Sequence, residues 1–108
     1  MEKTFVMIKP DGLKRGLVGK IIQRYEQKGL KIIAVKLVNV TKDLAYKHYA
    51  EHSSKPFFPE LIAYITSGPV LAMILEGPNA IKLARLINGA TMVEDALPGT
   101  IRGDFATS

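Results

Sequence analysis

Cysteine is absent from the 108-residue sequence. The chain can therefore form no disulfide and offers neither a thiolate nucleophile nor a cysteine-ligated metal site, while a reducing compartment is permitted. Long apolar runs are lacking as well, because the longest pure one covers residues 70–75 and is far too short to span a membrane. No signal-peptide pattern precedes the first apolar run at residues 5–8. We therefore expect a cytoplasmic protein with no membrane partner.

Internal repeats, low-complexity tracts and linker-like segments are missing too. We therefore expect one domain over residues 1–108. Hydrophobic residues make up 47% of the chain, which is enough to bury the core of a small domain. The net charge of +5 suits polyanionic partners such as nucleic acid, anionic lipid or a phosphorylated small molecule, but does not choose among them.

Hydrophobic periodicity predicts alternating strands and helices. Residues 5–8 are all apolar and too few for a helix, so we expect a strand that is buried on both faces. Apolar residues from Val18 to Tyr25 recur at the spacing of one helix face, and Gly29 ends that helix. The later expected elements are a strand at residues 30–40, a helix capped by Thr41 and running to about His52, a helix at 57–67, a strand at 70–75 and a helix from about Pro78 to Gly89.

Two of these elements carry apolar residues on more than one face. The strand at residues 30–40 is apolar in both alternating registers, and the helix at 57–67 has two apolar sides. Each therefore needs a second burial partner, and we expect the protein to self-associate. The strand at 70–75 is rich enough in aliphatic residues to lie at the centre of the sheet.

The predicted order is β-α-β-(α-α)-β-α, followed by residues 90–108, which show no period. This order describes an α+β fold of the split β-α-β type, with an antiparallel sheet, helices mainly on one face and no final edge strand. Aperiodic loops longer than about 12 to 15 residues are uncommon in compact domains. We therefore expect the chain to be C-terminally incomplete.

Four polar residues outside the apolar stripes are of the types that hold a phosphate chain. Lys9 directly follows the first strand and Pro10 then turns the chain away, so we expect the ammonium group to point outward from a rigid strand end. Arg85, Thr91 and Arg102 add two guanidinium forks and a hydroxyl donor. Each cation taken singly could equally be a solvated surface side chain, and spacing does not show that the four converge.

A second candidate group lies in the middle of the chain. Tyr49 and His52 share a helix face and could donate hydrogen bonds to an anion. His48 and His52 form an H-x-x-x-H pair, but no third ligand follows at a recognisable spacing, so we expect no metal site built by the protein. Phe57 and Leu61, one helical turn apart, could form an apolar slot for a planar ring, with ordinary core packing as the alternative.

Four segments occur in the order and at the spacing of one known family: FVMIKPDG, HYAEHSSKPFF, ITSGPVLAMILEG and GATMVEDALPGTIRGDF. The chain resembles the nucleoside diphosphate kinases over its whole length. The resemblance implies a ferredoxin-like domain that moves the γ-phosphate of a nucleoside triphosphate to a nucleoside diphosphate through a phosphohistidine. It also implies Mg²⁺ on the nucleotide phosphates, little dependence on the base, and homo-oligomers in which dimers assemble into tetramers or hexamers.

The resemblance further implies a role for each candidate residue. Lys9 matches the family lysine that reaches the ribose hydroxyls and phosphate, and Tyr49 and His52 match residues beside the phosphates. Phe57 and Leu61 match the pair that clamps the base. These roles suit the chemistry, because phosphoryl transfer depends on positioning and charge neutralisation, and stacking on a phenyl face tolerates any base.

The C-terminal part of the match includes both agreement and departures. Arg85, Thr91 and Arg102 match the phosphate-holding set, but Met92-Val93 stands where the family usually has Asn-Pro. The family's ribose-contacting asparagine and phosphate-accepting histidine lie beyond the GDF segment, and this sequence ends before either. The acceptor is therefore unassigned, and the 108 residues as written are expected to be inactive.

Two other classes of function compete with this prediction. An RNA-binding split β-α-β domain needs exposed strand aromatics and a motif of the K/R-G-F/Y-G/A-F-V-x-F/Y type, which these strands lack, so no specific nucleic acid is expected. A nucleotide-binding relative that is catalytically inactive or regulatory remains the alternative, since the chain as given would behave in that way.

Overall fold

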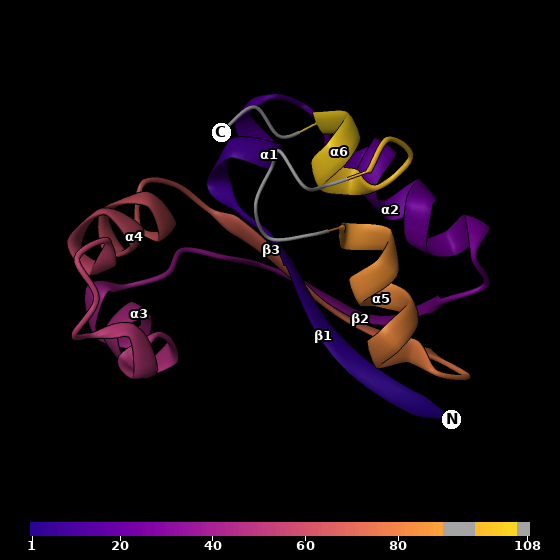
Figure 1. The fold of residues 1–108 in the computed structure, drawn as a ribbon, viewed down its shortest axis with the longest axis horizontal. Helices are drawn as coiled ribbons and strands as arrows, with labels where there is room; N and C mark the ends of the chain where they lie inside the picture. The colour runs from indigo at the N-terminus through magenta and orange to yellow at the C-terminus, as the bar shows by residue number, and fades with distance from the viewer. Residues whose placement is uncertain (90–96, 106–108) are drawn as a thin grey trace.

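A computed structural model describes residues 1–89 and 97–105 of the chain. Its centre is an antiparallel three-stranded sheet with the order β1-β3-β2 (Figure 1). The strands are β1 (Glu2–Ile8), β2 (Lys31–Val38) and β3 (Val70–Gly77). The expected antiparallel sheet and the central position of the aliphatic strand β3 are confirmed. The helices are α1 (Pro10–Lys14), α2 (Val18–Gln27), α3 (Lys42–His48), the 3₁₀ helix η1 (Ala50–His52), α4 (Phe58–Ile65), α5 (Ala80–Asn88) and α6 (Ile101–Phe105).

The strand register sets which side chains reach which face of the sheet. β1 runs against β3 from the pair Glu2 and Gly77 to the pair Ile8 and Leu71. β2 pairs with the other edge of β3, with an irregularity between Ile32 and Ala34. β1 and β2 are therefore the two edges of the described sheet.

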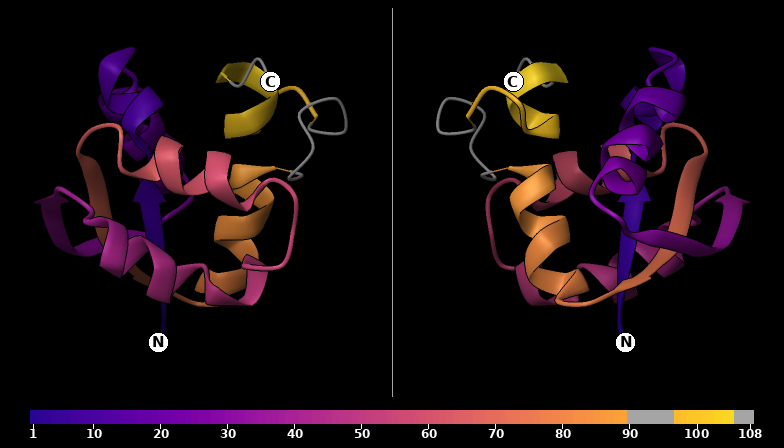
Figure 2. Two further views of the ribbon diagram at one scale, coloured as in Figure 1. Left: turned by 90° about the vertical axis from the view of Figure 1, so that its left-hand side faces the viewer. Right: turned by 90° about the vertical axis from the view of Figure 1, so that its right-hand side faces the viewer.

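α2 and α5 pack on one face of the sheet, as the order of elements predicts, and α3 and α4 reach only the end of the other face. One core joins the strands to α2 and α5 and includes Val6, Tyr25, Met73 and Leu75. A second core lies beneath α3 and α4 around Ile65. Figure 1 shows α3 and α4 at one end of the sheet, away from α2 and α5, and Figure 2 views the molecule from each of these two ends.

The edge strands are less buried than their apolar runs predict. Val6 and Ile8 are buried on one face of β1, but Phe5 on the opposite face is 51% exposed. The expectation that this strand is buried on both faces is therefore wrong. On β2, Val35 and Leu37 are 53% and 61% exposed. Both strands lie at an edge of the sheet, where each pairs with a neighbour on one side only.

The ends of the longer helices agree with the sequence signals. Gly29 follows α2 with φ of 83°, and Gly89 follows α5 with φ of 88°, a region in which a side chain would be strained. The Thr41 hydroxyl accepts a hydrogen bond from the Leu44 amide at 3.2 Å and so caps α3. α3 itself ends at His48, and the remainder of the expected helix forms η1.

Two local expectations are corrected by the fold. Pro10 does not only turn the chain, because it also begins the short helix α1, a position that suits its fixed φ. Residues 101–105 form α6, although no periodicity appears there. On α4, Ile62 and Ile65 are buried, whereas Phe57 and Tyr64 on the second apolar side are 47% and 38% exposed.

Candidate functional site

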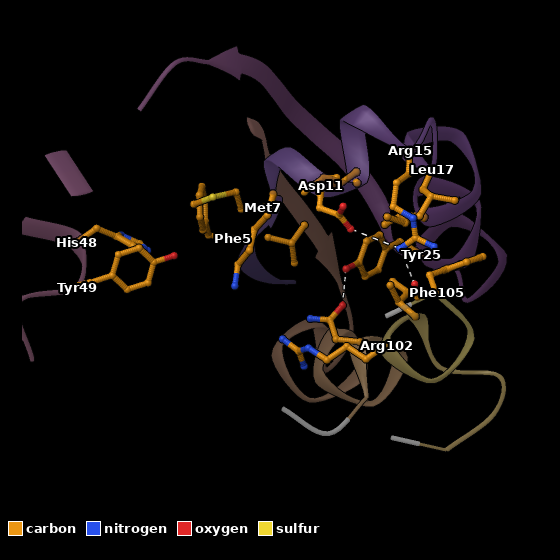
Figure 3. Close-up of a pocket in the computed structure, with 17 residues that line it drawn as sticks. Phe5, Met7, Asp11, Arg15, Leu17, Tyr25, His48, Tyr49, Arg102 and Phe105 are labelled. Atoms are coloured by element: carbon orange, nitrogen blue, oxygen red, sulfur yellow. Dashed lines mark hydrogen bonds and ion pairs between the residues drawn. The ribbon is translucent and has the colours of Figure 1, made fainter. Parts of the chain in front are cut away.

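A cavity of about 380 Å³ follows the free edge of β1 (Figure 3). β1, α1, α2, α6 and the end of α5 contribute to its wall, and His48 and Tyr49 at the end of α3 line its opposite side. Three of the expected phosphate-binding or phosphate-adjacent residues, Lys9, Tyr49 and Arg102, line this one cavity. In Figure 3, Arg102 lies on the α6 side of the cavity and Tyr49 on the opposite side.

Lys9 is half-buried at the end of β1, so its ammonium group does not simply point out into solvent. Burial lowers the pKa of Lys9 below its ordinary value of 10.5, and the nearby charge of Arg102 lowers it further. A bound anion would relieve both effects. The cavity is lined by three cations, Lys9, Arg15 and Arg102, a setting that favours a polyanionic ligand.

Arg102 is carried by α6, and its Nη1 donates a hydrogen bond to the Gly89 carbonyl oxygen at 2.7 Å. Gly89 ends α5, so this bond joins the ends of two elements beside the cavity. The bond limits the conformations that the Arg102 side chain can adopt. A guanidinium that is restrained before ligand arrives loses less side-chain entropy on binding phosphate.

Asn88, the last residue of α5, also lines the cavity and was missed by the sequence argument. The Tyr25 hydroxyl, buried in the core, donates a hydrogen bond to Asn88 Oδ1. Burial raises the pKa of Tyr25 to about 12, and the Arg102 charge opposes that rise. The only available signal was Tyr25 itself, because a tyrosine in an apolar helix stripe needs a partner for its hydroxyl.

An aromatic row extends from the cavity towards α4. The ring centroids of Tyr49 and His52 are 6.5 Å apart, and those of His52 and Phe57 are 5.8 Å apart. His52 Nε2 lies 3.5 Å from Glu51 Oε1, while its buried Nδ1 has no hydrogen-bond partner in the part of the chain that the structure describes. Burial, followed by the nearby Tyr64, raises the pKa of the Tyr49 hydroxyl.

Phe57 lies at the outer end of this row with 47% of its surface exposed. The Lys55 ammonium is 5.7 Å from the centre of its ring. Leu61, one turn further along, is half-buried. Ordinary core packing therefore does not describe Phe57, which offers a ring that a ligand can reach.

Four of the other expected residues, His52, Phe57, Leu61 and Arg85, do not line this cavity. Arg85 is exposed on α5 and lines a different hollow, together with Glu2 and Lys82. Thr91 lies outside the described residues. His48, the other member of the histidine pair, packs edge-on against Tyr49 with ring centroids 4.7 Å apart. Within residues 1–89 and 97–105, no group of three or more histidine, cysteine, aspartate or glutamate side chains is placed to hold a metal ion.

The described helices are all too short or too polar to cross a membrane.

Comparison with known proteins assigns the chain to a family. The family model described as nucleoside diphosphate kinase matches residues 2–108. Nucleoside diphosphate kinases of Caldanaerobacter subterraneus and Thermus thermophilus are 64% and 62% identical over 108 residues, which is all of this chain and 78% and 79% of theirs.

Solved structures give the same result. A halophilic nucleoside diphosphate kinase from Halobacterium salinarum, solved in complex with CDP, has a TM-score of 0.97 and 53% identity over 99% of this chain and 70% of its own. A nucleoside diphosphate kinase family protein from Babesia bovis has a TM-score of 0.92 and 51% identity, covering 99% and 72%. The chain therefore belongs to the nucleoside diphosphate kinase family and has its ferredoxin-like fold.

Proposed function

We propose that this member of the family holds the phosphates of its nucleotides between Lys9 and Arg102. The reaction of the family moves the γ-phosphate of a nucleoside triphosphate to a nucleoside diphosphate by way of a phosphohistidine. The observation that carries the proposal is that both cations line the cavity beside β1, with Tyr49 on its opposite side. Fixed cations neutralise the charge that phosphoryl transfer spreads over the phosphate oxygens.

The nucleoside would extend from this cavity along the aromatic row. Phe57 would stack on the base with Leu61 completing the slot, while Tyr49 and His52 donate hydrogen bonds to phosphate. The exposure of Phe57 and the 5.8 Å separation of its ring from His52 support this arrangement. Stacking on a phenyl face discriminates weakly among bases, so nucleoside di- and triphosphates of any base would be accepted.

Arg85 and Thr91 complete the proposed phosphate-holding set. Arg85 is exposed on the last turn and a half of α5, whose final residue Asn88 borders the cavity. Its long side chain would turn towards the phosphates when they bind. Support for Thr91 comes from its match to the family pattern.

Mg²⁺ would enter bound to the nucleotide, where it neutralises phosphate charge. The cavity is lined by apolar side chains, by the cations Lys9, Arg15 and Arg102, and by one carboxylate, Asp11, a set that leaves most of the ligands of Mg²⁺ to the nucleotide phosphates. Lys9 and Arg102 would hold the phosphates from the protein side. We also propose one domain over residues 1–108 that works in the cytoplasm as a dimer-based homo-oligomer, with no specific nucleic acid partner.

Binding measurements test the proposed roles. In calorimetry, Phe57→Ala should weaken ADP and adenosine similarly, by roughly 1 to 3 kcal/mol, because it removes base stacking. Arg102→Ala should weaken ADP far more than adenosine, because only ADP carries the phosphates. Unchanged ADP affinity in Arg102→Ala would remove this residue from the site.

The phosphate acceptor is a separate proposal. His52 would donate a hydrogen bond to phosphate, and a ring nitrogen that carries this hydrogen has no free lone pair with which to attack phosphorus. His48 packs on Tyr49 instead. We therefore propose that residues 1–108 alone bind nucleotide without forming the phosphohistidine. Incubation with γ-labelled ATP should leave no acid-labile, base-stable label on this chain, whereas a full-length family member should become labelled. Stable label on His48 or His52 would show that the nucleophile lies within these residues.

A further inference from the structure

α6 is a helix of five residues, and it carries the Arg102 side chain into the cavity. A helix of this length cannot maintain itself through its own hydrogen bonds, since isolated helices shorter than about 12 residues are marginal in water. Its placement must come from contacts with other elements. Those contacts therefore determine where the Arg102 guanidinium lies.

Arg24 on α2 makes three of these contacts with one guanidinium group. Its Nη2 lies 2.7 Å from Asp104 Oδ2, and its Nη1 donates to the Gly99 carbonyl oxygen at 2.8 Å. Its central carbon lies 5.1 Å from the centre of the Phe105 ring. The side chains of Arg24 and Asp104 are each only 28% exposed, which reduces solvent screening of the pair.

The contacts close into a ring. Asp104 uses its second carboxylate oxygen, Oδ1, to accept a hydrogen bond from the Gly99 amide at 2.8 Å. That hydrogen bond, and then the bond from Arg24, hold the pKa of Asp104 below its usual 3.8, so the carboxylate is charged at neutral pH. Arg24, Asp104 and Gly99 are thus each joined to the other two.

The ring lies beside the proposed phosphate site and not in it. Arg102 lines the cavity, whereas Arg24 and Asp104 lie outside its wall. Two residues along a helix turn the side chain by about 200°, which places Asp104 and Arg102 on opposite sides of α6. α2 therefore holds one side of this short helix while the other side presents Arg102.

We propose that Arg24 is a positioning residue for the phosphate-binding arginine, acting through Asp104 and Phe105 on α6 and through Gly99 just before it. The inference rests on the proposed role of Arg102 in holding phosphate. Arginine is required rather than lysine, because a planar fork can donate to a carboxylate and a carbonyl at once while it stacks on a ring. A lysine at position 24 would keep the charge but make only part of this set.

A double-mutant cycle with ADP and adenosine in calorimetry tests the inference. Arg24→Gln should lower ADP affinity by about tenfold and Arg24→Lys by less, with adenosine affinity changed less than about twofold. In the Arg102→Ala background, Arg24→Gln should have no further effect on ADP. Lys20→Gln removes the same charge from an exposed position of α2 and should leave ADP affinity unchanged.

Each other result overturns a defined part of the argument. An Arg24→Gln effect of equal size with and without Arg102 would show a general structural role, and no effect with Arg102 present would show that α6 needs no such support. If Arg102→Ala itself leaves ADP affinity unchanged, the proposed phosphate role fails, and the inference fails with it. Asp104→Asn, which breaks the ring from the α6 side, supplies the same cycle should Arg24→Gln not fold.

Discussion

At the scale of single residues, Lys9 and Arg102 show how the fold brings two like charges near one another. Burial lowers the pKa of Lys9, and the like charge of Arg102 lowers it further. The free protein carries this electrostatic cost, and a polyphosphate that binds between the two groups offsets it. The same pair of charges therefore slightly destabilises the free protein and stabilises the complex with a polyphosphate.

Tyr25 connects the core to the cavity wall, because its buried hydroxyl donates to Asn88 Oδ1. Its pKa rises from 10.0 to about 12 on folding, since burial disfavours the phenolate. The folded state therefore holds this proton more tightly than the unfolded chain. The stability that the group contributes is complete below pH 10 and is lost as the pH rises towards 12.

Tyr25→Phe should cost about 1 kcal/mol of unfolding free energy at pH 8, because it removes the hydrogen bond to Asn88. At pH 11 the advantage of the wild type over this variant should be smaller by about 1.4 kcal/mol, since one unit of pH has passed between the unfolded and folded pKa values. Urea unfolding at both pH values measures the two differences. Tyr46→Phe, at a tyrosine that is 49% exposed, is the control and should show neither change. An advantage that stays constant from pH 8 to pH 11 would contradict the raised pKa.

At the scale of elements, the longer segments could be predicted from sequence and the short ones could not. α2 and α5 repeat their apolar stripe over two turns or more and end at glycines with positive φ, so the pattern itself carries the information. The aliphatic run of β3 indicated a central strand, and β3 pairs with both β1 and β2, with Met73 and Leu75 buried in the main core. α6 has only five residues, and it is held by Arg15 and Arg24 from distant parts of the chain and by the packing of Ile101 and Phe105 on the core, which no local pattern reveals.

For the candidate site too, some residues could be predicted from the sequence and others could not. Chemical type and family resemblance indicated Lys9 and Arg102, and the fold places both on one cavity. Asn88 could not be predicted, because its position depends on Tyr25 of another helix. The exposure of Phe5 also could not be predicted, since an apolar run has the same sequence at the edge of a sheet as at its centre.

Gly103 permits the tight turn that begins α6. A Cβ at this position would overlap the Leu97 carbonyl oxygen and would lie 2.8 Å from Thr100 Oγ1. Gly103→Ala should therefore move α6, lower the stability by about 1 to 3 kcal/mol and weaken ADP binding through Arg102. Thermal unfolding and calorimetry on the same variant measure both effects.

Gly19→Ala is the matched control for that substitution. Gly19 lies in α2, and a Cβ there would meet nothing within 4 Å. Alanine has the higher helix propensity, so this variant should be more stable than the wild type by roughly 0.5 to 1 kcal/mol. If Gly103→Ala behaves like Gly19→Ala, the close approach of α6 to Leu97 is not present in solution.

At the scale of the whole molecule, the apolar edge of the sheet has no cover from the described part of the chain. Ile33, Val35 and Leu37 of β2 are 40%, 53% and 61% exposed. An edge strand also presents unpaired backbone donors and acceptors, which invite another strand or another chain. A second copy related by a two-fold axis would cover the same residues on both partners.

We therefore predict that the chain self-associates through β2, and that Leu37→Lys dissociates the assembly. Lysine on an edge strand opposes association, because two copies would bring like charges together where apolar side chains had met. Sedimentation velocity should show a wild-type species heavier than the 11.9 kDa chain and a lighter Leu37→Lys species. Leu86→Lys makes the same change at a leucine of α5 that is 62% exposed, so it should leave the assembly intact. A wild-type protein that stays at 11.9 kDa at high concentration would contradict the prediction, and equal dissociation by both variants would place the interface elsewhere.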